Sequence, residues 1–371
     1  VIANNAHRKE KRLFTSSEDG DKIQIYMAAD ERDEGRWIAG EIEKMHGRGM
    51  NYDDMAVFYR TNAQSRMLED MFLRAGVPYR IVGGTKFFDR AEIRDVMAYL
   101  TLVVNPADDI AAKRVINVPR RGIGKTTIER IDAMARAEQC TFMQAAELSI
   151  VDENIRMGVR NSLAEFVMLV KEGASYEGDL RKVVEMIIER SGLIEALRAE
   201  GTDEALGRIE NIQEFLGVVD EFVTTHDEDE APYASPTHSF AAQAADAIAQ
   251  AEDILRAAAA GEGVTSDRIM LPEADAPEDA PVRVLRGNSL ADLIEWVLLR
   301  TDLDSMNEDG HSITMMTVHS SKGLEFDVVF VAGMEESLFP HMNSVHDAQG
   351  IEEERRLAYV AITRARQRLY M

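Results

Sequence analysis

The sequence predicts an α/β protein: a parallel sheet domain built from both ends of the chain, interrupted by a large, mainly helical inserted domain. Short apolar stretches alternate with amphipathic stretches up to about residue 87. Residues 92–222 then carry almost only helical patterns, and strand patterns return after residue 310. Alternating strands and helices favour a parallel sheet with right-handed crossovers. We place the sheet domain at 1–92 and 310–371, and the inserted domain at 93–309.

The first elements alternate between strand and helix. IQIYMAA, beginning at Ile23, is expected as a strand, and ERDEGRWIAGEIEKMHG as a helix because its apolar residues recur at helical spacing. DMAVFYR (54–60) is expected as a buried strand. The helix over TNAQSRMLEDMFLRAG should end at Gly76, and YRIVGG (79–84) follows as a strand.

The later elements repeat this order after a helical interval. The helices are broken at NPADD, VPRRGIG and SGL. SITMMTVHSS (312–321) and DVVFVAG (327–333) are expected to form strands. EEERRLAYVAITRAR (352–366) is expected as a helix, with a last strand at RLYM.

Residues 223–285 are expected to form a mobile acidic segment. Between residues 221 and 290 there are 14 acidic and 4 basic residues, with many Ala, Pro and Ser. Such a composition buries too little apolar area to offset its ordering entropy, apart from one candidate helix in AAQAADAIAQAEDILRAAA.

The composition excludes several classes of protein. A single cysteine, Cys140, excludes a disulfide framework and a multi-cysteine metal site, and suits a reducing cytoplasm. No apolar run approaches the roughly 20 residues that span a bilayer, so no membrane partner is expected. The net charge of −24 argues against a large surface that binds nucleic acid. The distribution of charge along the chain is more informative for such binding than the net charge. VIANNAHRKEKR, with neither Met nor a signal peptide, is interpreted as the interior of a longer polypeptide.

The stretch VPRRGIGKTTI (118–128) contains GKT, the ending of a phosphate-binding loop. That loop requires G-x-x-x-x-G-K-[ST], and Pro119 occupies its first glycine position. Proline has no N–H to donate to a phosphate. A P-loop kinase that binds ATP at GKT is therefore a candidate function, and it is less favoured than the two considered below.

Four segments carry residues suited to binding nucleotides or nucleic acids. Open α/β sheets bind ligands at the carboxyl ends of their strands, so we expect these segments at one sheet edge. Arginines there can neutralise a transferring γ-phosphoryl group, although each could equally form a surface ion pair. Tyr59 and Arg60 stand at the end of one strand, and MEESLFPH follows another. The loop after a third strand carries His319, Lys322, Gly323 and Glu325. On or near the last helix are Arg355, Arg356 and Arg364.

Five long segments resemble, in order, the UvrD/PcrA/Rep family of superfamily 1 DNA helicases: AVFYRTNAQSRMLEDMF, PYRIVGGTKFFDRAEIRDVMAYL, INVPRRGIGKTTI, TVHSSKGLEFDVVFVAGMEESLFPH and EEERRLAYVAITRAR. The resemblance fails only across the acidic segment. It implies a bacterial 3′→5′ ATP-dependent translocase with two RecA-like domains, each with an inserted helical domain. This chain would be the second RecA-like domain and its insertion.

The resemblance also implies roles for the residues of a nucleotide site. Tyr59 would stack on adenine, and Arg60 would reach the γ-phosphate. Gly323 would lie near that phosphate, and Glu325 would meet the ribose. Arg364 would be the second γ-phosphate arginine.

DNA contacts are implied at two further places. VPRRGIGKTTI resembles a helix–hairpin–helix whose glycines permit a tight turn and whose second helix opens at about Thr126. The amino end of that helix and nearby basic residues would hold a DNA phosphate, the alternative being a plain turn with solvated charges. The expected DNA-binding residues are His319, Lys322, Arg120, Arg121, Gly122, Gly124, Lys125 and Thr126, whereas Arg355 and Arg356 could only brace their helix.

The resemblance places the Walker A lysine and the Walker B acid pair in the first RecA-like domain, and this chain contains no G-x-x-x-x-G-K-[ST]. ATP and Mg²⁺ are therefore expected as cofactors of the longer parent, with Mg²⁺ ligands outside this chain, and the chain alone should be inactive. The alternative is a catalytically silent DNA- or protein-binding module. Expected partners are single-stranded and duplex-junction DNA, the N-terminal RecA-like domain, and repair or polymerase proteins, in the bacterial cytoplasm at the nucleoid.

Overall fold

The computed structural model describes residues 1–5, 21–176, 178–227, 289–305, 310–345 and 347–371. Nearly all belong to one compact unit, formed by residues 1–222 and 288–371. The predicted acidic segment lies outside the described residues apart from its first five, and its candidate helix lies wholly outside them.

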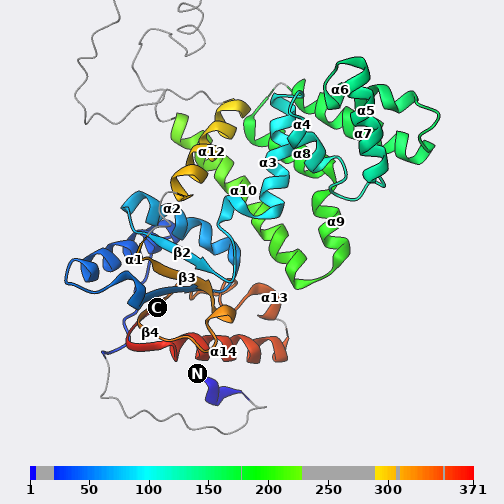
Figure 1. Ribbon diagram of the computed structural model, residues 1–371. Coiled ribbons are helices and arrows are strands. Elements are labelled where there is room, and N and C mark those ends of the chain that lie inside the picture. Colours follow the sequence, from blue (N-terminus) through cyan, green and yellow to red (C-terminus); the bar gives the residue numbers. More distant parts are fainter. Residues whose placement is uncertain (6–20, 177, 228–288, 306–309, 346) are drawn as a thin grey trace, which may run out of the picture. The chain divides into compact units, whose positions relative to one another are not determined.

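The described strands form one parallel sheet in the order β2-β3-β1-β4-β5 (Figure 1). Segments from both ends of the chain therefore lie side by side, which confirms the predicted sheet. The strands are β1 Met55–Tyr59, β2 Tyr79–Val82, β3 Ile313–Thr317, β4 Phe326–Val331 and β5 Ala365–Tyr370.

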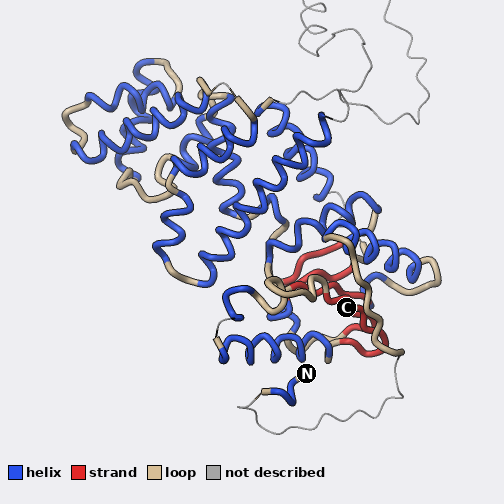
Figure 2. Tube along the Cα trace, turned by 180° about the vertical axis from the view of Figure 1, so that it is seen from behind, coloured by secondary structure: helices blue, strands red, loops and turns tan. Residues whose placement is uncertain are grey.

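Helices lie on both faces of the sheet, and they make up most of the described residues between β2 and β3 (Figure 2). The helical pattern predicted for residues 92–222 is confirmed, whereas the division into a sheet domain and an inserted domain stays a prediction. None of the described helices combines the length and apolar character that a membrane crossing requires. The helices are α1 Glu31–His46, α2 Ser65–Ala75, α3 Ala91–Val104, α4 Asp109–Val115, α5 Lys125–Glu138, α6 Phe142–Leu148, α7 Met157–Ala174, α8 Leu180–Ser191, α9 Leu193–Glu200, α10 Asp203–Asp227, α12 Leu290–Ser305, α13 Met342–Val345 and α14 Ala348–Ile362.

Both faces of the sheet are buried because strand side chains alternate between two apolar clusters. On β1, Val57 and Tyr59 pack with residues of α1 and α2. Phe58, their neighbour, packs on the opposite face with Leu357 and Ala361 of α14. Full burial of each large apolar side chain contributes roughly 1.5–3 kcal/mol.

The strand predicted from Ile23 is wrong in its length. Only Gln24 forms a bridge, to Tyr370 of β5, and Met27 is 91% exposed. The chain leaves the sheet because the Asp33 carboxylate accepts hydrogen bonds from the Tyr26 hydroxyl and the Ala29 N–H. These bonds direct the segment into α1.

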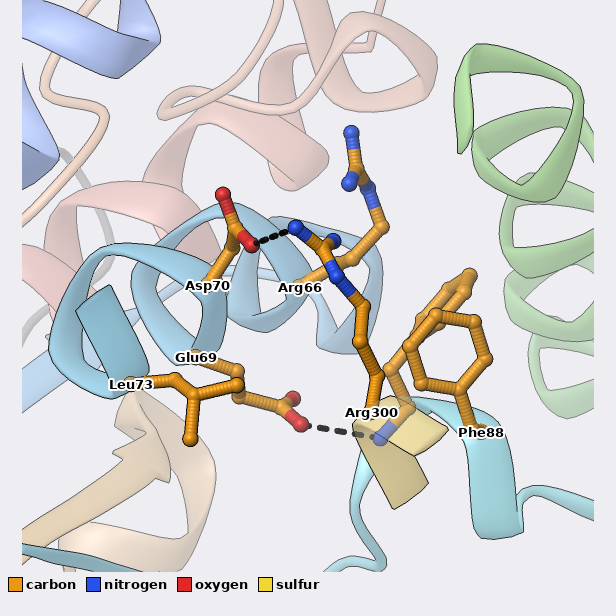
Figure 3. Close-up of a pocket in the computed structure, with 7 residues that line it drawn as sticks. Arg66, Glu69, Asp70, Leu73, Phe88 and Arg300 are labelled. Atoms are coloured by element: carbon orange, nitrogen blue, oxygen red, sulfur yellow. Dashed lines mark hydrogen bonds and ion pairs between the residues drawn. The ribbon is translucent and has the colours of Figure 1, made fainter. Parts of the chain in front are cut away.

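A buried cluster of charged side chains joins α2 to α10 and α12. Arg66, 5% exposed, donates to Glu214 at 2.6 Å and to Glu221 at 3.1 Å. Arg300 lies 2.7 Å from Asp70, and the two side chains point toward each other (Figure 3). Burial raises the pKa of Glu221, but Arg66 and Arg300 outweigh it and hold that pKa below its usual value. The two arginines therefore favour the charged form of Glu221.

Replacing Arg66 should destabilise the chain strongly. Arg66→Met removes the buried arginine from two ion pairs, with Glu214 and with Glu221, which should lower the free energy of unfolding by about 3–5 kcal/mol in urea titrations. The matched control is Arg74→Met, because Arg74 also contacts Glu221 but is 56% exposed. The control should cost less than about 1 kcal/mol. Equal losses for the two variants would contradict the importance of burial here.

Candidate functional site

Gly323, Glu325 and Arg364 lie together at the amino ends of β4 and β5, and we call them the amino-edge group. Nη1 of Arg364 donates to the Leu324 carbonyl at 3.0 Å, between the other two members. The Phe326 N–H donates to the Arg364 carbonyl, also at 3.0 Å. The structure thus brings together residues that are about 40 positions apart, at the amino edge and not at the carboxyl edge where the sequence placed them.

The local conformation of this group suits the approach of a charged ligand. Gly323 has φ +89° and is exposed, a conformation that favours glycine and leaves the backbone accessible. Nε of Arg364 donates to the Val360 carbonyl near the end of α14, at 3.2 Å. These bonds hold the guanidinium in place before a ligand arrives. The Glu325 carboxylate is exposed and lies 3.4 Å from Arg366.

Arg60 lies at the opposite, carboxyl edge of the sheet. Its Nη2 donates to Oε1 of Glu354 at 2.8 Å, and its Nε to Oε2 at 3.0 Å. Glu354 is 4% exposed and also accepts from the His341 N–H and the Ser344 hydroxyl. Burial raises the pKa of Glu354, but its hydrogen bonds and the charge of Arg60 outweigh burial and lower it. Arg60 therefore has a buried ionic partner within the chain.

The expectation that Arg60 and Arg364 meet at one edge is not met. Tyr59 pairs with Thr317 at the carboxyl end of β3, whereas β4 begins at Phe326, two residues before the partner of Met55. The two levels are roughly 20 Å apart. The loop after β3 crosses from the carboxyl edge to the amino edge. The expectation that all candidate residues lie at the carboxyl ends of the strands did not anticipate this crossing.

Tyr59 also departs from its expected place. Its side chain is 0% exposed and belongs to the cluster on the α1 and α2 face. A base can stack only on an accessible ring face, so the described conformation does not support adenine stacking. The inward position follows from the alternation of side chains along β1.

His319 and Lys322 lie on the path between the two edges. His319 is in a short 3₁₀ helix, Val318–Ser321, that contacts α14. Partial burial, followed by the charge of Arg60, lowers the pKa of His319. This shift favours the neutral imidazole, which offers an N–H donor rather than a cation. Lys322 is exposed.

The turn between α4 and α5 exposes most of its predicted DNA-binding residues. Gly122 is exposed at φ +75°, while Ile123 beside it is fully buried. Gly124 begins α5 without a side-chain cap, and Lys125 is 89% exposed. Arg120 and Thr126 are likewise exposed. Free N–H groups at a helix start and nearby cations form a usable phosphate site.

Arg121 is a correction to the prediction, because its side chain turns inward. Its Nη2 donates to the Ser191 carbonyl at 2.8 Å and to the Tyr99 hydroxyl at 2.7 Å. A basic residue in a glycine-containing loop was expected in solvent, but these acceptors hold it inside. Arg356 pairs with Glu352 and Glu353 of its own helix, consistent with a bracing role.

Sequence reasoning missed Glu354 and Asn117. Glu354 pairs with a residue 294 positions away, which no local pattern reveals. Asn117 accepts hydrogen bonds from two backbone N–H groups of the α4–α5 turn. Its position just before a G-x-G turn was the only available signal. Among the described residues, no group of three or more His, Cys, Asp or Glu side chains is placed to hold a metal ion.

The sequence matches, over residues 1–371, the family described as the UvrD-like helicase C-terminal domain. It is similar to the ATP-dependent DNA helicase UvrD1 of Mycobacterium tuberculosis, with 38% identity over 378 residues. It is also similar to the ATP-dependent DNA helicase PcrA of Staphylococcus aureus, with 35% identity over 376 residues. Both alignments cover the whole chain and 43% of the relative, so the chain spans less than half the length of these curated relatives.

The Arg60–Glu354 pair should make stability depend on pH. Because the folded pKa of Glu354 is lowered, its stabilisation is present above its unfolded value of about 4.3 and is lost as pH falls through the folded pKa. Glu354→Gln should cost roughly 3 kcal/mol at pH 7, since Arg60 is left uncompensated. The difference from the parent chain in urea titrations should shrink below about pH 4. A difference that stays constant down to pH 3 would contradict the ionic origin.

Proposed function

Because the chain belongs to the UvrD-like helicase C-terminal domain family, we propose that it is the C-terminal portion of a bacterial 3′→5′ ATP-dependent DNA helicase acting in DNA repair or replication. The observation that carries this proposal is the amino-edge group. A tethered arginine, an exposed glycine in the left-handed region and a carboxylate come from two distant segments and meet in one place. In the cell this protein would act on chromosomal DNA in the cytoplasm.

The amino-edge group forms one wall of the proposed nucleotide site. Arg364 neutralises charge on the transferring γ-phosphoryl group, because its guanidinium is already oriented by the Val360 and Leu324 carbonyls. Gly323 lets backbone approach the phosphates, and Glu325 accepts hydrogen bonds from the ribose. ATP and Mg²⁺ supply the hydrolysis chemistry in the parent, whose P-loop and Mg²⁺ ligands lie in its N-terminal RecA-like domain. Arg60 has a structural role in this proposal, because its guanidinium is already paired with the Glu354 carboxylate.

DNA is bound at two other places in this proposal. His319 and Lys322 contact single-stranded DNA, with His319 as a neutral donor. The α4–α5 turn holds the duplex at a junction through Gly122, Gly124, Thr126 and the exposed cations Arg120 and Lys125. These contacts are directed at phosphates and so carry no sequence preference. Repair or polymerase proteins are further candidate partners of the parent.

A catalytically silent DNA- or protein-binding module is the second candidate. The closed Arg60–Glu354 pair favours it, because one of the two expected phosphate ligands is already occupied. In this case the chain would bind forked DNA without any nucleotide-dependent step. The two candidates differ in whether Arg364 matters to ATP turnover.

Arg364→Lys should abolish most ATP turnover when the chain is combined with a P-loop-bearing N-terminal half and single-stranded DNA. A lysine cannot reproduce the forked guanidinium, and loss of an arginine finger costs about 10³-fold or more. The control is Arg60→Lys, which should retain turnover within a few-fold. Retained turnover in Arg364→Lys, or robust hydrolysis by this chain alone, would refute the proposed site.

Removing the exposed cations of the α4–α5 turn should weaken duplex binding by the chain. For Arg120→Ala with Lys125→Ala, the slope of log affinity against log salt should fall by about one to two, because each phosphate contact contributes about 0.9. Lys171→Ala is the control, since Lys171 is 61% exposed but lies on α7 and pairs with Glu147. An unchanged slope in the double variant would exclude the turn as a DNA site.

A further inference from the structure

We infer that Asn117 and Arg121 are positioning residues that brace the α4–α5 turn, so that the amino end of α5 is held in the orientation that binds a DNA phosphate. This inference rests on the proposed DNA-binding role of the turn. The sequence predicted that Arg121 contacts the DNA directly, and it did not identify Asn117. Both residues receive a supporting function here.

The Arg121 guanidinium ties the turn to three helices. Nη1 donates to the Val118 carbonyl at 3.0 Å, within the turn itself. Nη2 donates to Tyr99 of α3 and to the carbonyl of Ser191 at the end of α8. The guanidinium carbon also lies 5.6 Å from the ring centroid of Phe166 on α7. A side chain committed to these partners is not available to a phosphate, but it fixes where the turn sits.

Asn117 holds the other side of the same turn. Its Oδ1 accepts from the Arg121 N–H at 2.9 Å and from the Ile123 N–H at 3.2 Å. These bonds span Gly122, the exposed tip at φ +75°. Ile123 is 0% exposed, so its side chain anchors the turn between the two glycines. The backbone from 117 to 124 is thus fixed by two polar side chains and one apolar side chain.

The neighbouring α8–α9 turn provides the support for this brace. A Cβ atom at Gly192 would lie 3.6 Å from Cγ of Pro119, so the two turns approach each other closely. Arg121 bonds the Ser191 carbonyl immediately before that glycine. Motion of the turn away from α8 would therefore break this hydrogen bond.

Bracing affects function because the proposed phosphate ligands include backbone N–H groups. Gly124 precedes α5 in an extended conformation and carries no side chain that could follow a moving phosphate. Binding groups of this kind must be held within about 0.5 Å of their productive geometry. Lys125, with a long and exposed side chain, can adapt, whereas the backbone cannot. Loss of the brace should weaken binding without removing any cation from the DNA.

The test uses the full 371-residue chain and a fluorescent duplex with a single-stranded tail, titrated over a series of salt concentrations. Arg121→Lys keeps the positive charge but replaces the planar fork, whose two terminal nitrogens reach Val118 and Ser191 separately, by a single nitrogen. Asn117→Ala changes no charge. Each variant should bind about tenfold more weakly with an unchanged salt slope, because an oriented backbone site is lost rather than an ion contact. Hydrogen exchange at the Ile123 amide should be faster in both.

The controls separate this inference from the proposed DNA site. Arg120→Ala should lower the salt slope by about one without altering exchange at Ile123. If Arg121→Lys binds normally while Arg121→Gln lowers the slope by about one, Arg121 contacts phosphate directly and the inference is overturned. Normal binding by Asn117→Ala also overturns it, even where an Arg121 variant fails to fold. If Arg120→Ala and Lys125→Ala also have no effect, the proposed DNA site itself fails.

Discussion

The parallel pairing of β1 with both β3 and β4 determines where every candidate residue of the sheet lies. Since β3 and β4 run in the same direction on either side of β1, the chain between them must return from the carboxyl edge to the amino edge. Residues 318–325 make that return without a long helix. One short motif therefore starts near Arg60 and ends near Arg364, so its first residues and its last residues serve different surfaces.

Because of this geometry, α14 connects the two edges of the sheet. Glu354 in its first half receives Arg60 at the carboxyl edge, while Arg364 follows its last turn at the amino edge. The helix rises roughly 12 Å from Glu354 to Ile362. The helix also contacts the 3₁₀ segment that carries His319. One helix therefore contacts residues of both sheet edges.

The sequence was sufficient for the parallel sheet and the helical interval. Apolar periodicity specifies strands and helices because burial is set by local side-chain spacing. It could not separate the two sheet edges, because an edge is defined by register between strands that are more than 250 residues apart. The inward turn of Arg121 was missed for a similar reason, since its acceptors include Ser191, 70 positions away.

The hydrogen-bond and ionic partners of each arginine are set by the residues that the fold brings next to it, and not by the sequence motif in which it stands. Arg60 and Arg121 stand in basic or polar motifs, yet each has buried acceptors that satisfy its fixed fork of donors. Arg364 differs from Arg60, because it is bound mainly to backbone carbonyls and meets no buried carboxylate among the interactions described for it. Carbonyls orient a guanidinium without neutralising its charge. Arg364 therefore retains the positive field that an anionic ligand requires, and a nucleotide phosphate at the amino edge would meet an arginine already in position.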